Sequence, residues 1–477
     1  MVQEIASTSP LHSSRGAHER AKPGFTAGFC IFISKNRWAG INHSFLCFIG
    51  MKILIASTTS PGHLNPLLGI ARILVKSGHE VLVQTGKAMK PIVDAAGLPF
   101  IPLLPEADIG APEYLAKYPE RQEKTPGMEM FGFDMEHFFL ANLPAETAGL
   151  KKALRNFPAD IIMADSFFLG TLPLLLGARE KRPAIVHVGI TVLNHGSGKN
   201  IPPMPGISTE ELQAQHEKRE RLLLNPIEAA TEKTLTELGC GSLPCSVLES
   251  MSTLPDLYLH AGIESFQYAA SSSTSSPVHY IGRLPLPPGP YSLPDWWHDL
   301  DEAKRLVLVT QGTVANRDFG QLIGPALQGL AEEKDLIVLV TTGGQPAESI
   351  PVDIPANARV TAFLPYEYVL PKVDLLITNG GYGTVNMALA HGIPIVSAGL
   401  TEDKEEVSAN VQWSGAGIDL RTNQANPEMV RSAARQILDS SVYRNRASEL
   451  AEEFAQHDTE GELLDLLEAC VEPAIEA

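Results

Sequence analysis

The spacing of apolar residues alternates between a strand period and a helix period from residue 51 onward. The apolar, β-branched run MKILIAST (51–58) is followed by GHLNPLLGIARILVKSGHE (62–80), whose apolar residues recur at helical spacing. A second apolar run, VLVQTG (81–86), comes next. This order of strand, glycine-containing loop, helix and strand predicts one βαβ unit with parallel strands.

Three further apolar runs predict more strands of the same sheet. They are LPFIPL (98–103), ADIIMADSFF (159–168) and PAIVHVGI (183–190). Residues 105–145 are polar, aromatic and methionine-containing, and they show no clear period. Two interpretations of this region stay open, the lining of a pocket for an apolar ligand and the core of packed helices. The large side chains concerned are Tyr114, Tyr118, Met128, Met130, Phe131, Phe133, Phe138 and Phe139.

A second series of apolar runs begins after a segment dense in serine and proline (271–294). That segment predicts a loop and a stiff linker, although VHYIGRL (278–284) inside it has the pattern of one last strand. The strands predicted for the second series are RLVLVTQGT (305–313), LIVLVTTGG (336–344), ARVTAFLP (358–365), DLLITNGG (374–381) and IPIVSAG (393–399). Segments with helical spacing intervene at 319–333 and 427–440.

Two such series predict an α/β protein with two Rossmann-like domains, whose parallel sheets face each other across a cleft. The expected parts are a leader (1–50), an N-terminal domain (51–275), a linker (276–303), a C-terminal domain (304–450) and a helical tail (451–477). Lys35, Asn36 and Arg37 interrupt the apolar patches of the leader before they reach a membrane-spanning length. We expect the leader to be disordered or an artefact of the gene model.

Composition narrows the classes of partner. The chain has 477 residues, of which 44% are hydrophobic and 19% charged, so it can bury substantial cores. A formal net charge of -18 argues against nucleic acid or an anionic membrane as the main partner, and no stable membrane insertion is expected. The five scattered cysteines complete no metal-ligand pattern, which favours free thiols and a cytoplasmic location.

A glycine-rich stretch, TNGGYGT (378–384), lies between a buried-type strand and a helical run. Unpaired N–H groups and the dipole at a helix start attract an anion, and glycines let a phosphate approach the backbone. The candidates for such a diphosphate cradle are Asn379, Gly380, Gly381, Gly383 and Thr384. A tight turn without a ligand is the alternative. A second glycine turn, TQGT (310–313), favours the cradle if the two strands are neighbours.

His63 lies in the first predicted strand-to-helix loop, and a histidine there can act as a base near neutral pH. Asp165 ends a buried-type strand of the same sheet, where a carboxylate is costly without a partner. Such an Asp can hold the imidazole Nδ1–H and leave Nε2 free to take a proton from a hydroxyl. No serine or cysteine occupies a nucleophile-elbow pattern, and His187 and His195 are not spaced as metal ligands.

Together these motifs resemble the UDP-glycosyltransferase family, the inverting enzymes with two Rossmann-like domains (GT-B fold), including its macrolide glycosyltransferase-like members. The resemblance covers about residues 51–450 and is carried by GHLNPLLGIARILVKSGHEV, MADSF, VTQGT and the long segment from RVTAFLPYEYVLPKVDLLITNGGYGTVNMALAHGIPIV to TEDKEEVSANVQWSGAGI. It implies that the N-terminal domain (51–275) binds the acceptor and the C-terminal domain (304–450) the nucleotide sugar. It also implies that His63 deprotonates the acceptor hydroxyl and that Asp165 supports His63.

On the donor side, the resemblance implies a set of residues that bind the nucleotide sugar. They are Gly62, Gly312, Thr313, Phe363, Tyr366, Asn379, Gly380, Gly381, Gly383, Thr384, Asp403 and Lys404. Several depart from the family pattern. Phe363 replaces the usual base-stacking Trp and Tyr366 a common Gln, and Asn379 occupies the position of the pyrophosphate His. Met387 replaces the Glu that holds the ribose, and Lys404 the Gln of an Asp-Gln pair that contacts the sugar.

The function implied is transfer of a hexose from a nucleotide diphosphate sugar, UDP-glucose being expected, to a hydroxyl of a small apolar acceptor with inversion. No cofactor and no metal are expected. Two alternatives stay open: a non-catalytic relative that serves as partner or activator of another enzyme, and a nucleotide-sugar epimerase. The departures at Asn379, Met387 and Lys404 motivate the first, and retention of His63 and Asp165 argues against it.

Overall fold

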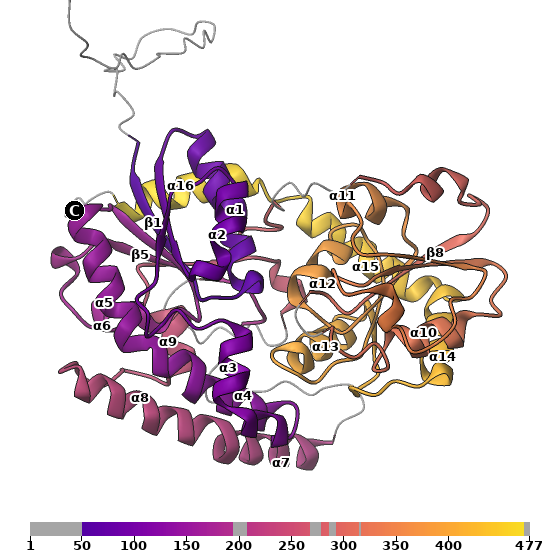
Figure 1. The fold of residues 1–477 in the computed structure, drawn as a ribbon, viewed down its shortest axis with the longest axis horizontal. Coiled ribbons are helices and arrows are strands. Elements are labelled where there is room, and N and C mark those ends of the chain that lie inside the picture. Colours follow the sequence, from indigo (N-terminus) through magenta and orange to yellow (C-terminus); the bar gives the residue numbers. More distant parts are fainter. Residues whose placement is uncertain (1–49, 194–207, 268–277, 286–291, 314–315, 472–477) are drawn as a thin grey trace, which may run out of the picture. The chain divides into compact units, whose positions relative to one another are not determined.

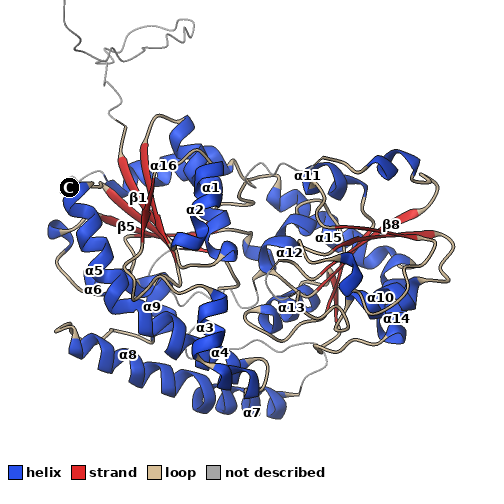
Figure 2. Ribbon diagram, in the orientation of Figure 1, coloured by secondary structure: helices blue, strands red, loops and turns tan. Residues whose placement is uncertain are grey.

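The structure is a computed structural model that describes residues 50–193, 208–267, 278–285, 292–313 and 316–471. Residues 50–477 form one compact unit, and apart from Gly50 the expected leader lies outside the described residues. The described part contains two parallel sheets with helices packed on their faces (Figures 1 and 2). The predicted α/β fold with two Rossmann-like sheets is confirmed.

The first sheet has seven strands in the order β3-β2-β1-β4-β5-β6-β7, all paired in parallel. The strands are β1 (Lys52–Ala56), β2 (Glu80–Thr85), β3 (Phe100–Pro102), β4 (Ile161–Asp165), β5 (Ala184–Gly189), β6 (Leu257–His260) and β7 (Val278–Tyr280). The chain winds outward from β1 to β3 and then returns to place β4 on the other side of β1. Such a switch point opens a crevice at the carboxyl ends of β1 and β4.

Successive residues of a strand point to opposite faces of a sheet, and both faces of this one are covered. Ile53 and Ile55 belong to one buried cluster with α1 (Pro61–Lys76), whereas Leu54 and Ala56 belong to another with α5 (Ala141–Asn156). Strands buried on both faces explain why the apolar runs of the sequence are nearly continuous. The other helices of this half are α2 (Lys90–Ala95), α3 (Ala111–Lys117), α4 (Met128–Asp134), α6 (Leu172–Leu175), α7 (Thr209–Arg219), α8 (Asn225–Glu237) and α9 (Val247–Thr253).

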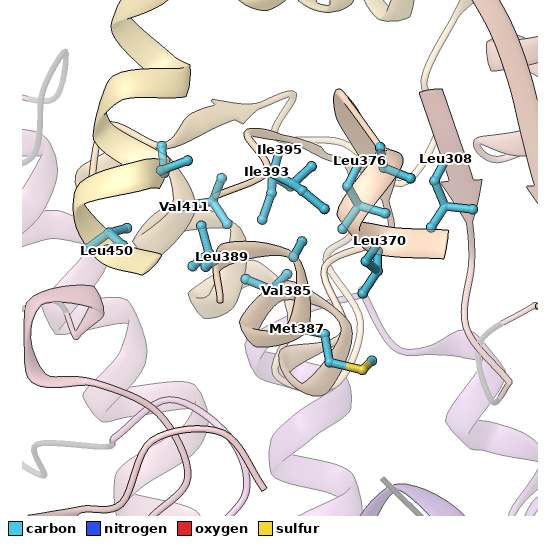
Figure 3. Close-up of a cluster of buried hydrophobic side chains, with 14 of the residues drawn as sticks. Leu308, Leu370, Leu376, Val385, Met387, Leu389, Ile393, Ile395, Val411 and Leu450 are labelled. Carbon is cyan, nitrogen blue, oxygen red and sulfur yellow. The ribbon is translucent and has the colours of Figure 1, made fainter. Parts of the chain in front are cut away.

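The second sheet has six parallel strands in the order β10-β9-β8-β11-β12-β13. They are β8 (Arg305–Thr310), β9 (Leu336–Thr341), β10 (Ala358–Thr361), β11 (Leu375–Thr378), β12 (Ile395–Ser397) and β13 (Gly417–Asp419). Its helices are α10 (Ile323–Leu330), α11 (Tyr366–Val369), α12 (Tyr382–Leu389), α13 (Lys404–Trp413), α14 (Pro427–Leu438) and α15 (Ser441–Phe454). One face packs on α12, α13 and α15 through the apolar cluster of Figure 3. The switch point of this sheet lies between β8 and β11.

The end of the chain returns to the first sheet. α15 packs in the second-sheet core, but Leu463 and Leu467 of α16 (Thr459–Val471) are fully buried in the first-sheet core, beside α1 (Figure 1). The Thr459 hydroxyl donates to the Ile281 carbonyl at 2.6 Å, and Lys76 pairs with Glu460 at 2.9 Å. Part of the expected tail therefore contributes to the N-terminal core.

The expected linker also contributes to both cores, because β7 joins the first sheet and Trp297 is buried in the cluster of the second. Cys240, Cys245 and Cys470 are free thiols, while Cys30 and Cys47 lie outside the described residues. Within the described ranges, no helix combines the length and apolarity needed to cross a lipid bilayer.

Candidate active site

His63 and Asp165 meet at the switch point of the first sheet. His63 lies in the first turn of α1, directly after β1, and Asp165 is the last residue of the neighbouring β4. The imidazole Nδ1 lies 2.9 Å from Asp165 Oδ1. The carboxylate is fully buried, whereas the His63 side chain keeps 20% of its surface exposed. The ring can therefore reach a ligand in the crevice while its partner stays shielded from water.

Two backbone groups hold the Asp165 carboxylate in place. The Phe167 N–H donates to Oδ1 at 3.0 Å, and the Thr58 N–H donates to Oδ2 at 3.2 Å. A carboxylate only accepts hydrogen bonds, so Nδ1 of His63 carries the proton that it donates to Oδ1. In the neutral ring Nε2 is then the unprotonated nitrogen, which is the state a general base requires.

Aromatic residues surround the imidazole. The ring of Phe139 lies 5.9 Å from that of His63, and the ring of Phe167 lies 5.8 Å away, centroid to centroid. Phe139 belongs to a π-helical turn (Met135–Leu140) that joins α4 to α5. Residues 105–145 are thus largely helical. Of their large side chains, Tyr114 and Met130 are buried, whereas Met128 and Phe131 line a pocket.

A small pocket, partly open to solvent, lies next to these aromatic rings. Its apolar wall comes from the first half of the chain: Gly127, Met128, Phe131, Phe167 and Leu223, with Thr191 beside them. Its acidic wall comes from the segment before α13 and from the start of that helix: Glu402, Asp403, Glu405 and Glu406. Phe167 therefore contacts the His63 ring and also lines a pocket that contains Asp403.

The two glycine turns are neighbours, as the cradle hypothesis requires. β8 and β11 pair in parallel with Thr310 opposite Thr378, so their turns leave the same edge of the sheet. Gly312 and Gly380 have φ angles of 69° and 87°, which favour glycine. A Cβ added at Gly312, Gly381 or Gly383 would meet no atom within 4 Å. The backbone at these turns is thus open to a ligand.

Gly380 differs from the other glycines proposed for the cradle because residues of α13 pack against it. A Cβ at this position would lie 2.8 Å from Ser408 Oγ and 3.3 Å from the Lys404 carbonyl, both in α13. Asn379 is also buried, and its side-chain N–H donates to the Gln311 carbonyl at 2.7 Å. The start of α12 is therefore fixed against both α13 and the 310–313 turn.

The predicted base-binding residues lie at the same edge of the second sheet. Phe363 follows β10, and its ring packs against Gly344, where a Cβ would lie 3.1 Å from the ring. Tyr366 begins α11, and its hydroxyl lies 3.0 Å from Thr341 Oγ1. Burial raises the pKa of Tyr366, which remains a neutral phenol. Met387, by contrast, is buried in the apolar cluster of Figure 3, so it offers no polar group to a ribose.

The two predicted sugar-binding residues behave differently. Asp403 faces the pocket, accepts the hydroxyl hydrogen of Thr191, and has its pKa raised by burial. Lys404 is buried, and its ammonium group pairs with Glu402. Burial by itself would raise the pKa of Glu402, but the charge of Lys404 and the hydrogen bond from it outweigh this and hold the pKa low.

Some residues of the site escaped the sequence analysis. Thr191 follows β5. The sequence could have indicated it, because ligands of open α/β sheets bind at the carboxyl ends of the strands. Glu402 is the neighbour of Asp403 in sequence. The guanidinium of Arg121 lies 3.9 Å from Glu402. No sequence pattern pointed to Arg121 as a site residue, because it lies in residues 105–145, where the apolar residues show no clear period. Thr313 stands in the 310–313 turn, whereas Thr384 and Gly62 lie in the first turns of α12 and α1. His195 lies outside the described residues.

Comparisons with known proteins identify the family. Residues 328–470 match the domain family described as Erythromycin biosynthesis protein CIII-like, C-terminal domain. UDP-glycosyltransferase 2 of Phaeomoniella chlamydospora is 34% identical over 85% of this chain and 92% of its own length. The chain belongs to the UDP-glycosyltransferase family. UDP-glucosyltransferase B1 of Starmerella bombicola is 32% identical over 86% of this chain and 95% of its own length.

The fold of this UDP-glycosyltransferase family member is the GT-B fold. Glycosyltransferase SnogD from Streptomyces nogalater superposes with a TM-score of 0.62 at 20% identity, covering 88% of this chain and 99% of that one. The relatives at 32–34% identity, which are named as a UDP-glycosyltransferase and a UDP-glucosyltransferase and match over most of the chain, show that the protein is an enzyme, a glycosyltransferase. Among the residues that the structure describes, no group of three or more His, Cys, Asp or Glu side chains is arranged to hold a metal ion.

Proposed function

We propose that this glycosyltransferase moves glucose from UDP-glucose to a hydroxyl of a small, largely apolar acceptor, with inversion at the anomeric carbon. The observation that carries the proposal is the hydrogen bond between His63 and the buried Asp165 at the switch point, beside a pocket that contains Asp403. The pairing favours a catalyst over a non-catalytic partner, since a scaffold does not require an oriented base.

The proposed reaction is a single displacement. Nε2 of His63 takes the proton of the acceptor hydroxyl while the oxygen attacks the anomeric carbon from the side opposite the leaving group. The bond from that carbon to the diphosphate oxygen breaks, and both electrons of this bond leave with the nucleotide diphosphate. Asp165 stabilises the imidazolium that forms. The reaction proposed requires no cofactor and no metal.

The glycine turns are proposed to stabilise the leaving diphosphate. N–H groups at the start of α12 and in the 310–313 turn would donate to phosphate oxygens, and the helix dipole adds to their effect. Donors positioned before the reaction are effective because they need no reorganisation as charge develops. Asn379 brings no charge to this site, so more of the stabilisation falls on the backbone around Gly380 and Gly381.

The donor is proposed from the residues at the edge of the second sheet. We propose that Phe363 stacks on a flat base and that Asp403 accepts hydrogen bonds from sugar hydroxyls. The Phe363 ring beside Gly344 and the presence of Asp403 in the pocket wall support this. Glucose is proposed because a similar protein is named a UDP-glucosyltransferase. A cytoplasmic location stays a prediction.

An apolar acceptor is proposed from the opposite wall of the pocket. Met128, Phe131, Phe167 and Leu223 offer little hydrogen bonding, so they favour a hydrocarbon or aromatic skeleton over a sugar or peptide. Hydrophobic burial of such a skeleton gains about 25 cal/mol for each Å² removed from water. One hydroxyl of the acceptor would then lie beside His63, where deprotonation is possible.

The experiment that tests the proposal incubates the enzyme with UDP-glucose and a library of apolar alcohols and phenols, and detects products by mass spectrometry. We expect acceptors heavier by one hexose, formed by the wild type and lost in His63→Ala. The matched control is His457→Ala, which removes a second histidine paired with a carboxylate, Glu462, at 2.9 Å. Transfer that survives in His63→Ala would contradict the proposal, and an isomerised sugar nucleotide would favour an epimerase.

A further inference from the structure

We propose that Tyr382 is a positioning residue that fixes the phosphate cradle relative to the first sheet through His260 and Gln267. Tyr382 stands between Gly381 and Gly383, at the first position of α12. The inference rests on the proposed roles of the cradle and of His63. It adds a side chain that would touch neither donor nor acceptor.

The Tyr382 hydroxyl is held by two polar side chains from the first half of the chain. It lies 2.9 Å from Nε2 of His260, the last residue of β6, and accepts a hydrogen bond from Nε2 of Gln267 at 3.0 Å. All three side chains are almost completely buried, Tyr382 keeping 5% of its surface exposed. Hydrogen bonds between buried groups are costly to lose, because the remaining partners cannot turn to water.

The backbone around this contact is shaped to admit the hydroxyl. Gly262 has a φ of 148°, and a Cβ at this position would lie 2.6 Å from Tyr382 Oη. The tyrosine ring also packs with Val192, Ile263 and Phe266 in the same buried cluster as the core of α12. Segments of the first half, at the end of β6 and after β5 and β6, therefore supply part of both the polar and the apolar surroundings of Tyr382.

Hydrogen bonds from the segment after β5 connect the Tyr382–Gln267 contact to the pocket. Gln267 uses its side-chain oxygen to accept the Leu193 N–H at 3.1 Å. Two residues earlier in the chain, Thr191 donates its hydroxyl hydrogen to Asp403. The segment after β5 is thus bonded to α12 through Gln267 and Tyr382, and to the start of α13 through Thr191. Each of these helices begins with residues proposed to bind the donor.

This arrangement gives Tyr382 a mechanistic role. The glycines on either side of it leave the backbone open to a ligand, while its own side chain points inward to the first half of the chain. A cradle that holds the leaving diphosphate must keep a fixed distance from the base that activates the attacking oxygen. Misplacement of reacting groups by about 1 Å can cost a hundredfold in rate, so a loosened α12 would slow transfer.

The test is Tyr382→Phe, which removes only the hydroxyl. We expect kcat for transfer to fall by about tenfold or more, with the Kd of UDP changed less than twofold, because the cradle N–H groups remain. The fraction of donor lost to water should rise. Tyr443→Phe is the matched control, since its hydroxyl accepts from Gln436 at 2.7 Å away from the cradle.

Variants of the partners separate positioning from stability. His260→Ala and Gln267→Ala should reproduce the loss of kcat, and His260→Gln, which can still hydrogen-bond the hydroxyl, should recover most of it. Unchanged kcat and unchanged donor hydrolysis in Tyr382→Phe, with only a lower Tm, would overturn the inference while leaving the proposed function intact. A wild type that transfers no sugar, or transfer that survives in His63→Ala, would overturn both.

Discussion

Asn379 donates its side-chain N–H to the backbone carbonyl of Gln311 at 2.7 Å, and this bond joins the two glycine turns of the second sheet. The two residues are far apart in sequence, but each follows a strand, and those strands, β8 and β11, are neighbours. The amide of Asn379 thus takes part in the shape of the cradle, whatever else it contacts.

Asn379→Ala is expected to weaken donor binding. The bond to Gln311 is lost and its carbonyl is left buried, which costs about 1–3 kcal/mol. We expect the KM for the donor to rise about tenfold, with a smaller change in kcat. Asn357→Ala is the matched control, because that side chain donates to the Leu330 carbonyl at 2.9 Å without approaching the cradle. Equal effects of both variants on KM would contradict the prediction.

Asp165→Asn tests the orientation of His63. The amide is nearly isosteric, but it no longer favours the Nδ1–H tautomer, so Nε2 loses its acceptor role. We expect kcat to fall by about 10³- to 10⁴-fold while the Kd of UDP stays unchanged. Single-turnover kinetics with titration calorimetry would measure both quantities. A loss of less than tenfold would show that His63 does not depend on this carboxylate.

Phe131→Ala should separate acceptor binding from donor chemistry. Phe131 lines the pocket, and its ring lies 6.2 Å from that of Phe167. Removing a largely buried ring costs about 1.5–3 kcal/mol of apolar contact, so we expect the acceptor KM to rise at least tenfold. Donor hydrolysis without acceptor should not change. Phe133→Ala is the control from the same helix, because that ring packs on His137, 4.2 Å away, and not in the pocket.

The free energy of unfolding is predicted to decrease as the pH is lowered from 6.5 to 4. Burial lowers the pKa of His187 to about 4, although its bond to the Met251 carbonyl opposes this. The unfolded chain binds a proton below pH 6.5 that the folded chain does not accept until pH 4. Unfolding therefore becomes easier as the pH falls through this range, by about 3 kcal/mol from this residue.

Urea unfolding of the wild type and of His187→Gln at pH 7.5 and pH 4 checks this prediction. Glutamine can still bond to Thr171 but does not titrate, so the variant should lose about 3 kcal/mol less on acidification. The exposed-site control is His298→Gln, which should follow the wild type. An identical loss in His187→Gln would show that other groups govern the acid sensitivity.

The sequence by itself determined the fold class and the positions of the two glycine turns, at 310–313 and 378–384. Apolar runs buried on both faces, alternating with helical segments, permit little besides parallel sheets covered by helices. Polar residues and glycines that interrupt the apolar runs could be recognised in the sequence as candidate site residues. These are the glycines after β8 and β11 and the aspartate at the end of β4. The family resemblance then gave each turn a role. All of these signals are local in sequence, as are the hydrogen bonds that form helices.

The tertiary structure decided which distant residues share a site. Asp165 contacts His63 because β4 pairs with β1, and Asn379 contacts Gln311 because β11 pairs with β8. Neither pairing follows from the spacing of apolar residues, which is the same for any order of strands. The place of Tyr382 beside His260 has no local signal at all, since the energy of that contact appears only when two buried surfaces meet.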